Sequence, residues 1–141
     1  MKFTISDPFN FINIKQRKIF KRANICLKKL QPNNYFYDVN ITNDKAIKKI
    51  NFKYRHQNKT TDVLSFAMHE NNKIKTPLLG EIFINYQQAQ RQANVSNEYE
   101  LTLLFIHGVL HLLGYDHHNK NAKKRMFDLQ NKIIKQLKLV G

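Results

Sequence analysis

The 141-residue sequence has one cysteine, three prolines, four glycines and no tryptophan. Because the single thiol of Cys26 cannot form an intramolecular disulfide, the chain suits a reducing cytosol better than a secreted setting. Cys26 falls on an apolar helical stripe, so we expect a buried core thiol. Long hydrophobic runs are absent too: residues 101–113 are too short to span a bilayer, and residues 1–7 do not have the pattern of a signal peptide. We therefore expect a cytoplasmic protein with no membrane contact.

Acidic residues are also scarce. Twenty-four Lys and Arg outnumber ten Asp and Glu, which gives a formal net charge of +14 and a sequence pI of about 10.0. Such a charge attracts polyanions, and nucleic acid is the commonest polyanion in a cytosol. The abundance of Lys, Asn and Ile is also typical of an AT-biased genome, whose codons favour these residues. The charge therefore supports a nucleic-acid partner without establishing one.

Apolar periodicity predicts a mixed order of strands and helices. Strands are expected at 2–6, 35–42, 62–66 and 81–85, and helices within 7–30, 43–54, 86–94, 98–113 and 121–138. The polar segment 68–79 is expected to be a loop. We find no linker, low-complexity tract or internal repeat in the sequence, so we expect one domain over residues 1–141. A sheet with helices on its faces fits this order, which places the chain in the α/β class.

Three of the expected helices carry start signals. Asp7 followed by Pro8 predicts an N-cap with proline in the first helical turn. Asn43 is expected to cap the second helix. Asn97, with Glu100 three residues later, predicts a capping box for the helix of 98–113.

The most informative segment, residues 104–118, holds four of the six histidines. His107 and His111 are four residues apart, so on a helix their imidazoles project from one face and can share a metal ion. Gly114 is the residue type that commonly ends a helix in the left-handed conformation, after which the chain can turn back and present His117. Two ligands from a helix and one from the following turn leave a fourth position open, as in catalytic zinc sites. We therefore predict a single Zn²⁺ held by these three histidines.

Three neutral imidazoles leave the charge of the cation uncompensated, which suits an anionic substrate such as a phosphodiester. Nickel and iron also accept three imidazoles, so the identity of the metal stays open. His118 is expected to be exposed, although it competes with its neighbour as a ligand. Asp116 either orients a ligand imidazole or is a solvated turn residue. Gly108 occupies the position at which His-Glu-x-x-His proteases carry their general base, so peptide hydrolysis is not expected.

A second group of candidate functional residues lies in residues 54–66, where Arg55 and Lys59 precede a strand. A guanidinium near the metal can hold phosphate oxygens and stabilise the charge of a transition state. An arginine ahead of a strand is also commonly a simple surface residue. The spacing in the sequence leaves both readings of Arg55 open.

These segments resemble the YbeY family, bacterial endoribonucleases also described as ribosomal RNA maturation factors. Residues 107–117 fit the family motif His-Gly-x-x-His-Leu-x-Gly-Tyr-Asp-His at every fixed position. Three further matches are Tyr54-Arg55, the run from Thr61 to Phe66, and Leu79-Gly80 followed by an acidic residue and an apolar strand. The resemblance covers roughly residues 38–137.

The resemblance implies a mixed, mostly parallel four-stranded sheet flanked by about five helices. It also implies a metal-dependent, single-strand-specific endoribonuclease that acts in maturation of small-subunit ribosomal RNA and in ribosome quality control. By the same resemblance His107, His111 and His117 hold the metal, and Arg55 is the active-site arginine. The implied partners are RNA and the small ribosomal subunit, and no small-molecule cofactor is expected.

The chain departs from the family pattern at four positions. The family commonly has glycine after the arginine, proline before Thr-Asp and after Ser-Phe, and aspartate after Leu-Gly. This chain has His56, Thr60, Ala67 and Glu81 there. None is a predicted metal ligand, but the first two belong to the loop that positions Arg55.

Our leading hypothesis is a zinc-dependent endoribonuclease in which Arg55 stabilises developing negative charge and the basic surface attracts RNA. The rival is a non-catalytic ribosome-assembly or RNA-binding factor whose metal site is structural. Phosphate attraction by the same net charge explains binding in either case.

Overall fold

A four-stranded sheet forms the framework of the protein, which a computed structural model describes over residues 1–69, 74 and 76–139. The strands are β1 (Lys2–Ser6), β2 (Phe36–Thr42), β3 (Val63–Ala67) and β4 (Leu78–Asn85). The helices are α1 (Ile14–Lys28), α2 (Asp44–Arg55), α3 (Tyr86–Gln92), α4 (Asn97–Leu112) and α5 (Lys120–Gln136). The strand order is β1-β2-β4-β3, with β3 antiparallel to β4 and the other pairs parallel. The expected α/β class and mostly parallel sheet are confirmed.

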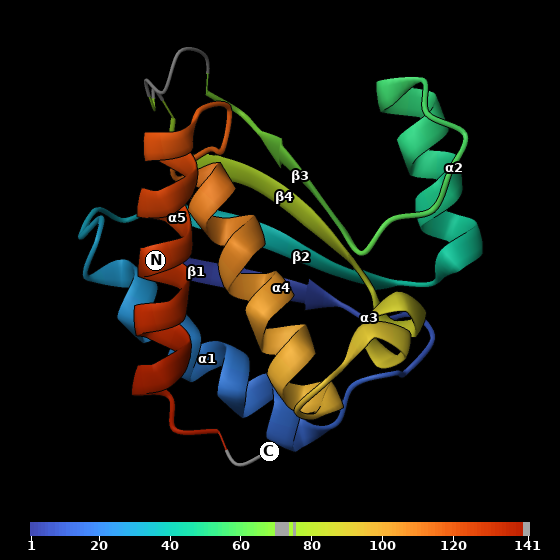
Figure 1. Cartoon of the computed structure of the whole chain (residues 1–141), viewed down its shortest axis with the longest axis horizontal. Helices are drawn as coiled ribbons and strands as arrows, with labels where there is room; N and C mark the ends of the chain where they lie inside the picture. Colours follow the sequence, from blue (N-terminus) through green and yellow to red (C-terminus); the bar gives the residue numbers. More distant parts are fainter. Residues whose placement is uncertain (70–73, 75, 140–141) are drawn as a thin grey trace.

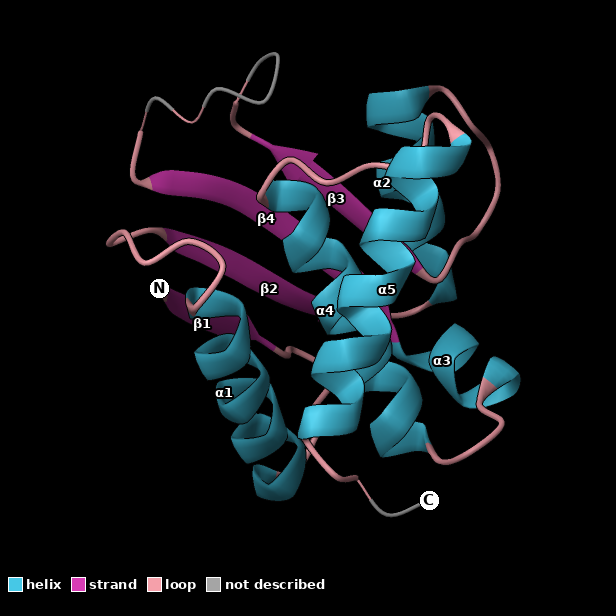
Figure 2. Ribbon diagram, turned by 60° about the vertical axis from the view of Figure 1, so that its left-hand side comes forward, coloured by secondary structure: helices cyan, strands magenta, loops and turns pink. Residues whose placement is uncertain are grey.

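Helices α1, α4 and α5 lie together over one face of the sheet, and α2 stands at the far end of the strands (Figures 1 and 2). Helix α4 is the centre of this layer because it packs on β3 and β4 and also contacts α1, α3 and α5. Its buried residues cover most of its circumference, while the side that carries His107 and His111 is only partly buried. Among the described residues, none of the helices has the length and apolarity that crossing a bilayer requires.

Gly108 sets how closely α4 approaches the sheet. A Cβ atom added at this position would lie 3.0 Å from Cγ2 of Ile82 and 3.3 Å from Oγ of Ser65. The hydroxyl of Ser65 donates a hydrogen bond to the Gly108 carbonyl at 3.3 Å. Glycine therefore lets the helix rest directly on β3 and β4, which brings the neighbouring histidine face of α4 close to β3.

The predicted caps of the first and fourth helices were wrong. Asn13, not Asp7, caps α1, and its side chain accepts a hydrogen bond from the Gln16 N–H at 2.8 Å. The Asp7 carboxylate instead accepts the N–H groups of residues 11 and 12 at 3.0 Å and so closes a turn before the helix. A short acceptor side chain satisfies free N–H groups in either setting, which is why the sequence misleads here. Helix α4 is capped by Ser96, one residue earlier than expected.

Two other expectations need adjustment. Cys26 is half-buried at the edge of the core and not fully enclosed. Strand β4 begins at Leu78, ahead of the predicted residue 81, because the pairing of β2 with β4 shifts by one residue beside Gly80. Such a bulge breaks the period-2 alternation on which the sequence prediction rests. Within the expected loop of 68–79, residues 70–73 and 75 lie outside the described residues.

Candidate metal centre

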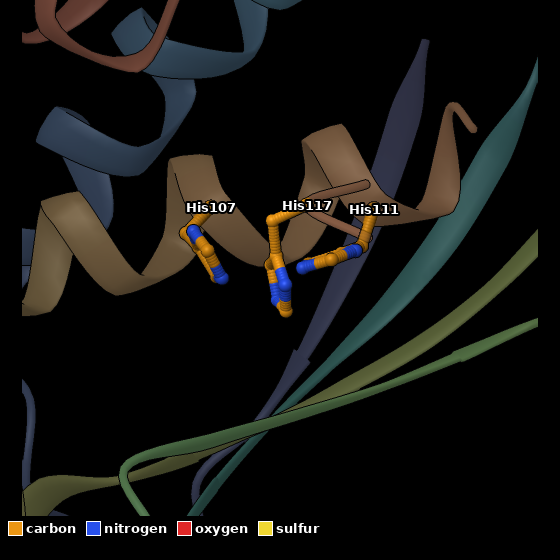
Figure 3. A group of neighbouring side chains, drawn as sticks. All are labelled: His107, His111 and His117. Carbon is orange, nitrogen blue, oxygen red and sulfur yellow. The ribbon is translucent and has the colours of Figure 1, made fainter. Parts of the chain in front are cut away.

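Three imidazoles converge beside α4. His107 and His111 lie one turn apart on this helix, and His117 reaches them from the segment that follows it (Figure 3). One ring nitrogen of each histidine lies within 4.8 Å of those of the other two. The ring centroids of His107 and His111 are 4.7 Å apart, and those of His111 and His117 are 5.2 Å apart. The structure therefore brings together the three histidines that the sequence spacing selected.

The turn that returns His117 depends on Gly114, whose φ is 102°. Its N–H donates to the His111 carbonyl, and the Tyr115 N–H donates to the Leu110 carbonyl, both at 3.0 Å. These two bonds form the Schellman arrangement, in which a left-handed residue ends the helix and reverses the chain. A side chain at this φ is strained, so glycine is the suitable residue.

The three histidines line a pocket of about 460 Å³ together with Arg55 and residues of β3 and its approach. The other lining residues are Asp62, Val63, Ser65 and Ala67. Val63, Ser65 and Ala67 alternate along β3 and therefore present one face of the strand to the pocket. The pocket thus lies between β3 and the histidine face of α4.

Arg55, the last residue of α2, reaches the same pocket. Its Nη2 donates a hydrogen bond to the Ser65 carbonyl at 2.8 Å, and its guanidinium carbon lies 5.3 Å from the centre of the Phe66 ring. The two contacts hold the guanidinium against β3, where it lines the pocket. Lys59 does not line it, and its carbonyl accepts a hydrogen bond from Asn51 at 3.0 Å.

Two imidazoles of the pocket, those of His107 and His111, favour their neutral forms. Burial, followed by the nearby rings of His107 and His117, lowers the pKa of His111 to about 4. Burial also lowers the pKa of His107, while its hydrogen bond with Gln130 and the charge of Asp62 act in the opposite direction. Neutral imidazole is the form that binds a metal ion, so His107 and His111 are prepared for one at neutral pH.

Gln130, on α5, is a site residue that the sequence analysis missed. Its Oε1 lies 2.9 Å from Nδ1 of His107, and only 5% of the residue is exposed. An amide oxygen can only accept, so this contact holds the proton on Nδ1 and leaves Nε2 free for a metal ion. A signal was present: Gln130 is a polar residue on the apolar stripe that includes Met126 and Ile133.

Asp116 and His118 do not line the three-histidine pocket, although the charge of Asp116 acts on the pKa of His111. The Asp116 carboxylate contacts the His118 ring and accepts its backbone N–H at 3.4 Å. The His118 side chain is 70% exposed, as expected. Of the two readings of Asp116, the structure therefore favours the turn residue, because its hydrogen bonds go to His118.

The donor set fits a divalent transition metal. Three nitrogen donors converge from three imidazole rings, and one ring is oriented by a buried hydrogen-bond partner, as is usual for metal-binding histidines. Arg55 and Asp62 face the remaining space of the pocket. Fold and site together define an α/β protein built around a candidate three-histidine metal centre.

Comparison with known proteins identifies the family of the chain. The model of the family described as "Endoribonuclease YbeY" matches residues 5–138, and the chain belongs to this family. An endoribonuclease YbeY of Ureaplasma urealyticum is 38% identical over 146 aligned residues, covering 99% of this chain and 94% of the relative. That of Oenococcus oeni is 43% identical and covers 95% and 82%. A Thermotoga maritima protein solved in solution superposes with a TM-score of 0.65 at 27% identity, covering 97% and 89%.

Proposed function

We propose that residues 1–141 form one metal-dependent, single-strand-specific endoribonuclease domain that acts in the cytoplasm, in maturation of small-subunit ribosomal RNA and in ribosome quality control. The observation that carries the proposal is the meeting of three imidazoles and one guanidinium in a single pocket of a chain with a net charge of +14. Membership of an endoribonuclease family supports RNA as the substrate.

His107, His111 and His117 are proposed to hold one Zn²⁺, although other divalent transition metals suit the same donors. When bound, the cation supplies a Lewis acid for the reacting phosphodiester. Gln130 keeps His107 in the tautomer that presents Nε2 to the ion.

Arg55 is proposed to be the residue that contacts the scissile phosphate. One of its N–H groups is used by the Ser65 carbonyl, which leaves others for phosphate oxygens. A guanidinium fixed in advance stabilises the negative charge that develops on the phosphate without reorganising during the reaction.

The test compares wild type, Arg55→Ala and His111→Ala on a single-stranded ribosomal RNA fragment, with elemental analysis of each protein. We expect bound zinc and cleavage in wild type, loss of metal in His111→Ala, and a fall in kcat of about 10²- to 10³-fold in Arg55→Ala with RNA binding and folding retained. Unchanged cleavage after His111→Ala would contradict the proposal. A wild type that binds the RNA without cleaving it would support the rival, a non-catalytic assembly factor.

A further inference from the structure

The outward face of α2 carries a cluster that the pocket does not use. Lys45, Lys48, Lys49 and Phe52, which we call the α2 patch, border a shallow hollow of about 240 Å³ together with Asn58. These positions follow helical spacing on one side of α2, while the buried residues of the helix lie on the other. Phe52 is 57% exposed, which is unusual for a large aromatic residue.

The positive charge of the α2 patch is not offset by the one acidic residue of the helix. The Asp44 carboxylate binds Arg91, with Nη1 to Oδ2 at 2.8 Å and Nη2 to Oδ1 at 2.6 Å. It also accepts a hydrogen bond from Asn85 at 2.8 Å. Because Asp44 is held on the side of α3 and β4, three lysines surround Phe52 without an acidic neighbour on their own helix.

The α2 patch and the candidate metal centre are connected through helix α2. Arg55 follows Phe52 by three residues, which is one helical turn, and it lines the three-histidine pocket. The distance from Lys45 to Arg55 along the helix is about 15 Å, the length of about four stacked nucleotides. Helix α2 stands apart from α1, α4 and α5 in Figure 1, and all four residues of the α2 patch are exposed.

We propose that the α2 patch binds the single-stranded RNA that flanks the scissile phosphate. Its lysines contact phosphates, and Phe52 stacks on one base. Stacking requires the flat face of a base, which a single strand offers and a duplex hides, and it tolerates any base identity. An aromatic ring surrounded by cations therefore fits single-stranded nucleic acid. The inference rests on the proposed function for the choice of RNA.

A matched control surface exists on α1. Lys18, Lys21 and Lys28 are exposed lysines of that helix, and Ile25 among them is 60% exposed. This surface has the same charge and a large apolar residue, but it belongs to a helix that contributes no residue to the three-histidine pocket. Differences between the two surfaces therefore report position and aromatic character, not net charge.

The experiment measures binding of a labelled 2′-O-methyl single strand of about 12 nucleotides to zinc-loaded protein by fluorescence anisotropy, at several salt concentrations. We expect Lys45→Gln/Lys48→Gln/Lys49→Gln to raise Kd at least about tenfold at low salt and to reduce the salt slope by about 2. We expect Phe52→Ser to raise Kd about 5- to 100-fold without altering the slope. Lys18→Gln/Lys21→Gln/Lys28→Gln and Ile25→Ser should stay close to wild type. Equal losses from the two lysine triples, or no loss in Phe52→Ser, would overturn the proposal.

Cleavage provides a second readout. The patch variants should lower kcat/KM for the long strand, mainly through KM, and leave a dinucleotide substrate unaffected because it ends at the pocket. Equal losses on both substrates would also overturn the proposal. The binding assay needs no cleavage, so a wild type that binds without cutting would contradict the proposed function and still decide the role of the α2 patch. Circular dichroism and thermal melting verify that each variant is folded.

Discussion

Nδ1 of His107 and the side-chain oxygen of Gln130 are joined across two helices, and this single contact determines which nitrogen of the ring is free. Replacing Gln130 by Leu removes the acceptor while keeping a similar volume. We expect the affinity for Zn²⁺ to fall about 10- to 100-fold, because such supporting hydrogen bonds orient the ligand ring. Competition with a chromogenic chelator measures the change.

Gln130→Glu is the control, since a carboxylate also accepts the proton of Nδ1. Its zinc affinity should stay within about threefold of wild type. If the Glu and Leu variants lose affinity equally, the contact acts through packing and the assigned orienting role is wrong.

The lowered pKa of His111 has a consequence for stability. Between its value of about 4 in the folded protein and the ordinary value of 6.5, the unfolded chain binds a proton at this side chain that the folded chain does not. The free energy of unfolding of the metal-free protein should therefore fall as the pH is lowered from about 6.5 toward 4. Urea denaturation across this window tests the sign. The curve of His111→Gln should be flatter, and equal slopes for the two proteins would contradict the assignment.

His56 stands where the family motif has glycine, and its backbone conformation is one that favours glycine. It follows α2 with φ 56° and ψ 29°, the left-handed region in which glycine is free of strain. We expect His56→Gly to raise the free energy of unfolding by about 1 kcal/mol, because relief of the side-chain strain exceeds the entropy that glycine loses. A lower urea midpoint in this variant would show that the His56 side chain stabilises the turn by other means.

At the scale of single residues, the sequence predicted contacts within one element better than contacts between elements. His107 and His111 were found because helical spacing alone makes them neighbours. The reach of Arg55 depends on how α2 meets β3, and that of Gln130 on how α5 meets α4. Local sequence spacing does not specify how these elements pack. The role of Arg55 therefore stayed open in the sequence analysis, and that of Gln130 was missed.

At the scale of elements, Gly80 and Gly108 both lie close to a neighbouring strand. The nearest atoms are backbone atoms at Gly80 and side-chain atoms at Gly108. A Cβ at Gly80 would lie 2.0 Å from the Phe66 carbonyl oxygen at a φ of 139°, and a backbone atom cannot move aside. We expect Gly80→Ala to lose about 3 kcal/mol or more. At Gly108 the nearest atoms belong to the Ile82 side chain, so Gly108→Ala should stay within about 1 kcal/mol of wild type. Urea denaturation that ranks the two variants in the opposite order would contradict this reading.

The existence of the helices and strands was predictable, whereas some of their ends were not. Runs such as Tyr37 to Ile41 and Leu101 to Val109 carry enough apolar residues to be recognised by period and length. The ends depend on single hydrogen bonds, and Asp7 and Asn97 have side chains able to cap where the chain uses Asn13 and Ser96. The bulge beside Gly80 depends on the partner strand, which no local pattern specifies.

At the scale of the whole molecule, the apolar core does not include the three histidines of the candidate metal centre. One continuous apolar cluster joins the sheet with α1, α4 and α5, and the histidine pocket lies beside it. We therefore expect the chelator-treated protein to remain folded with a lower Tm. Zinc at about 100 times its Kd should raise the stability by about 2.7 kcal/mol.

Differential scanning calorimetry with and without zinc measures this shift. His117→Ala should abolish the zinc-dependent rise in Tm and change the metal-free Tm little, because the His117 side chain is exposed. Unfolding on chelation alone would show that the metal is structural, as the rival hypothesis requires.

The hydrogen bond from Arg55 to the Ser65 carbonyl has one more consequence, since β3 is an edge strand of the sheet. An edge strand with free backbone groups is a template for pairing with another chain, and a charged side chain laid across it prevents such association. We therefore expect Arg55 to hinder self-association through β3 as well as to line the pocket. Loss of cleavage in Arg55→Ala reports chemistry only if light scattering shows the variant to be monodisperse, and aggregation of that variant alone would reveal the protective role of the arginine.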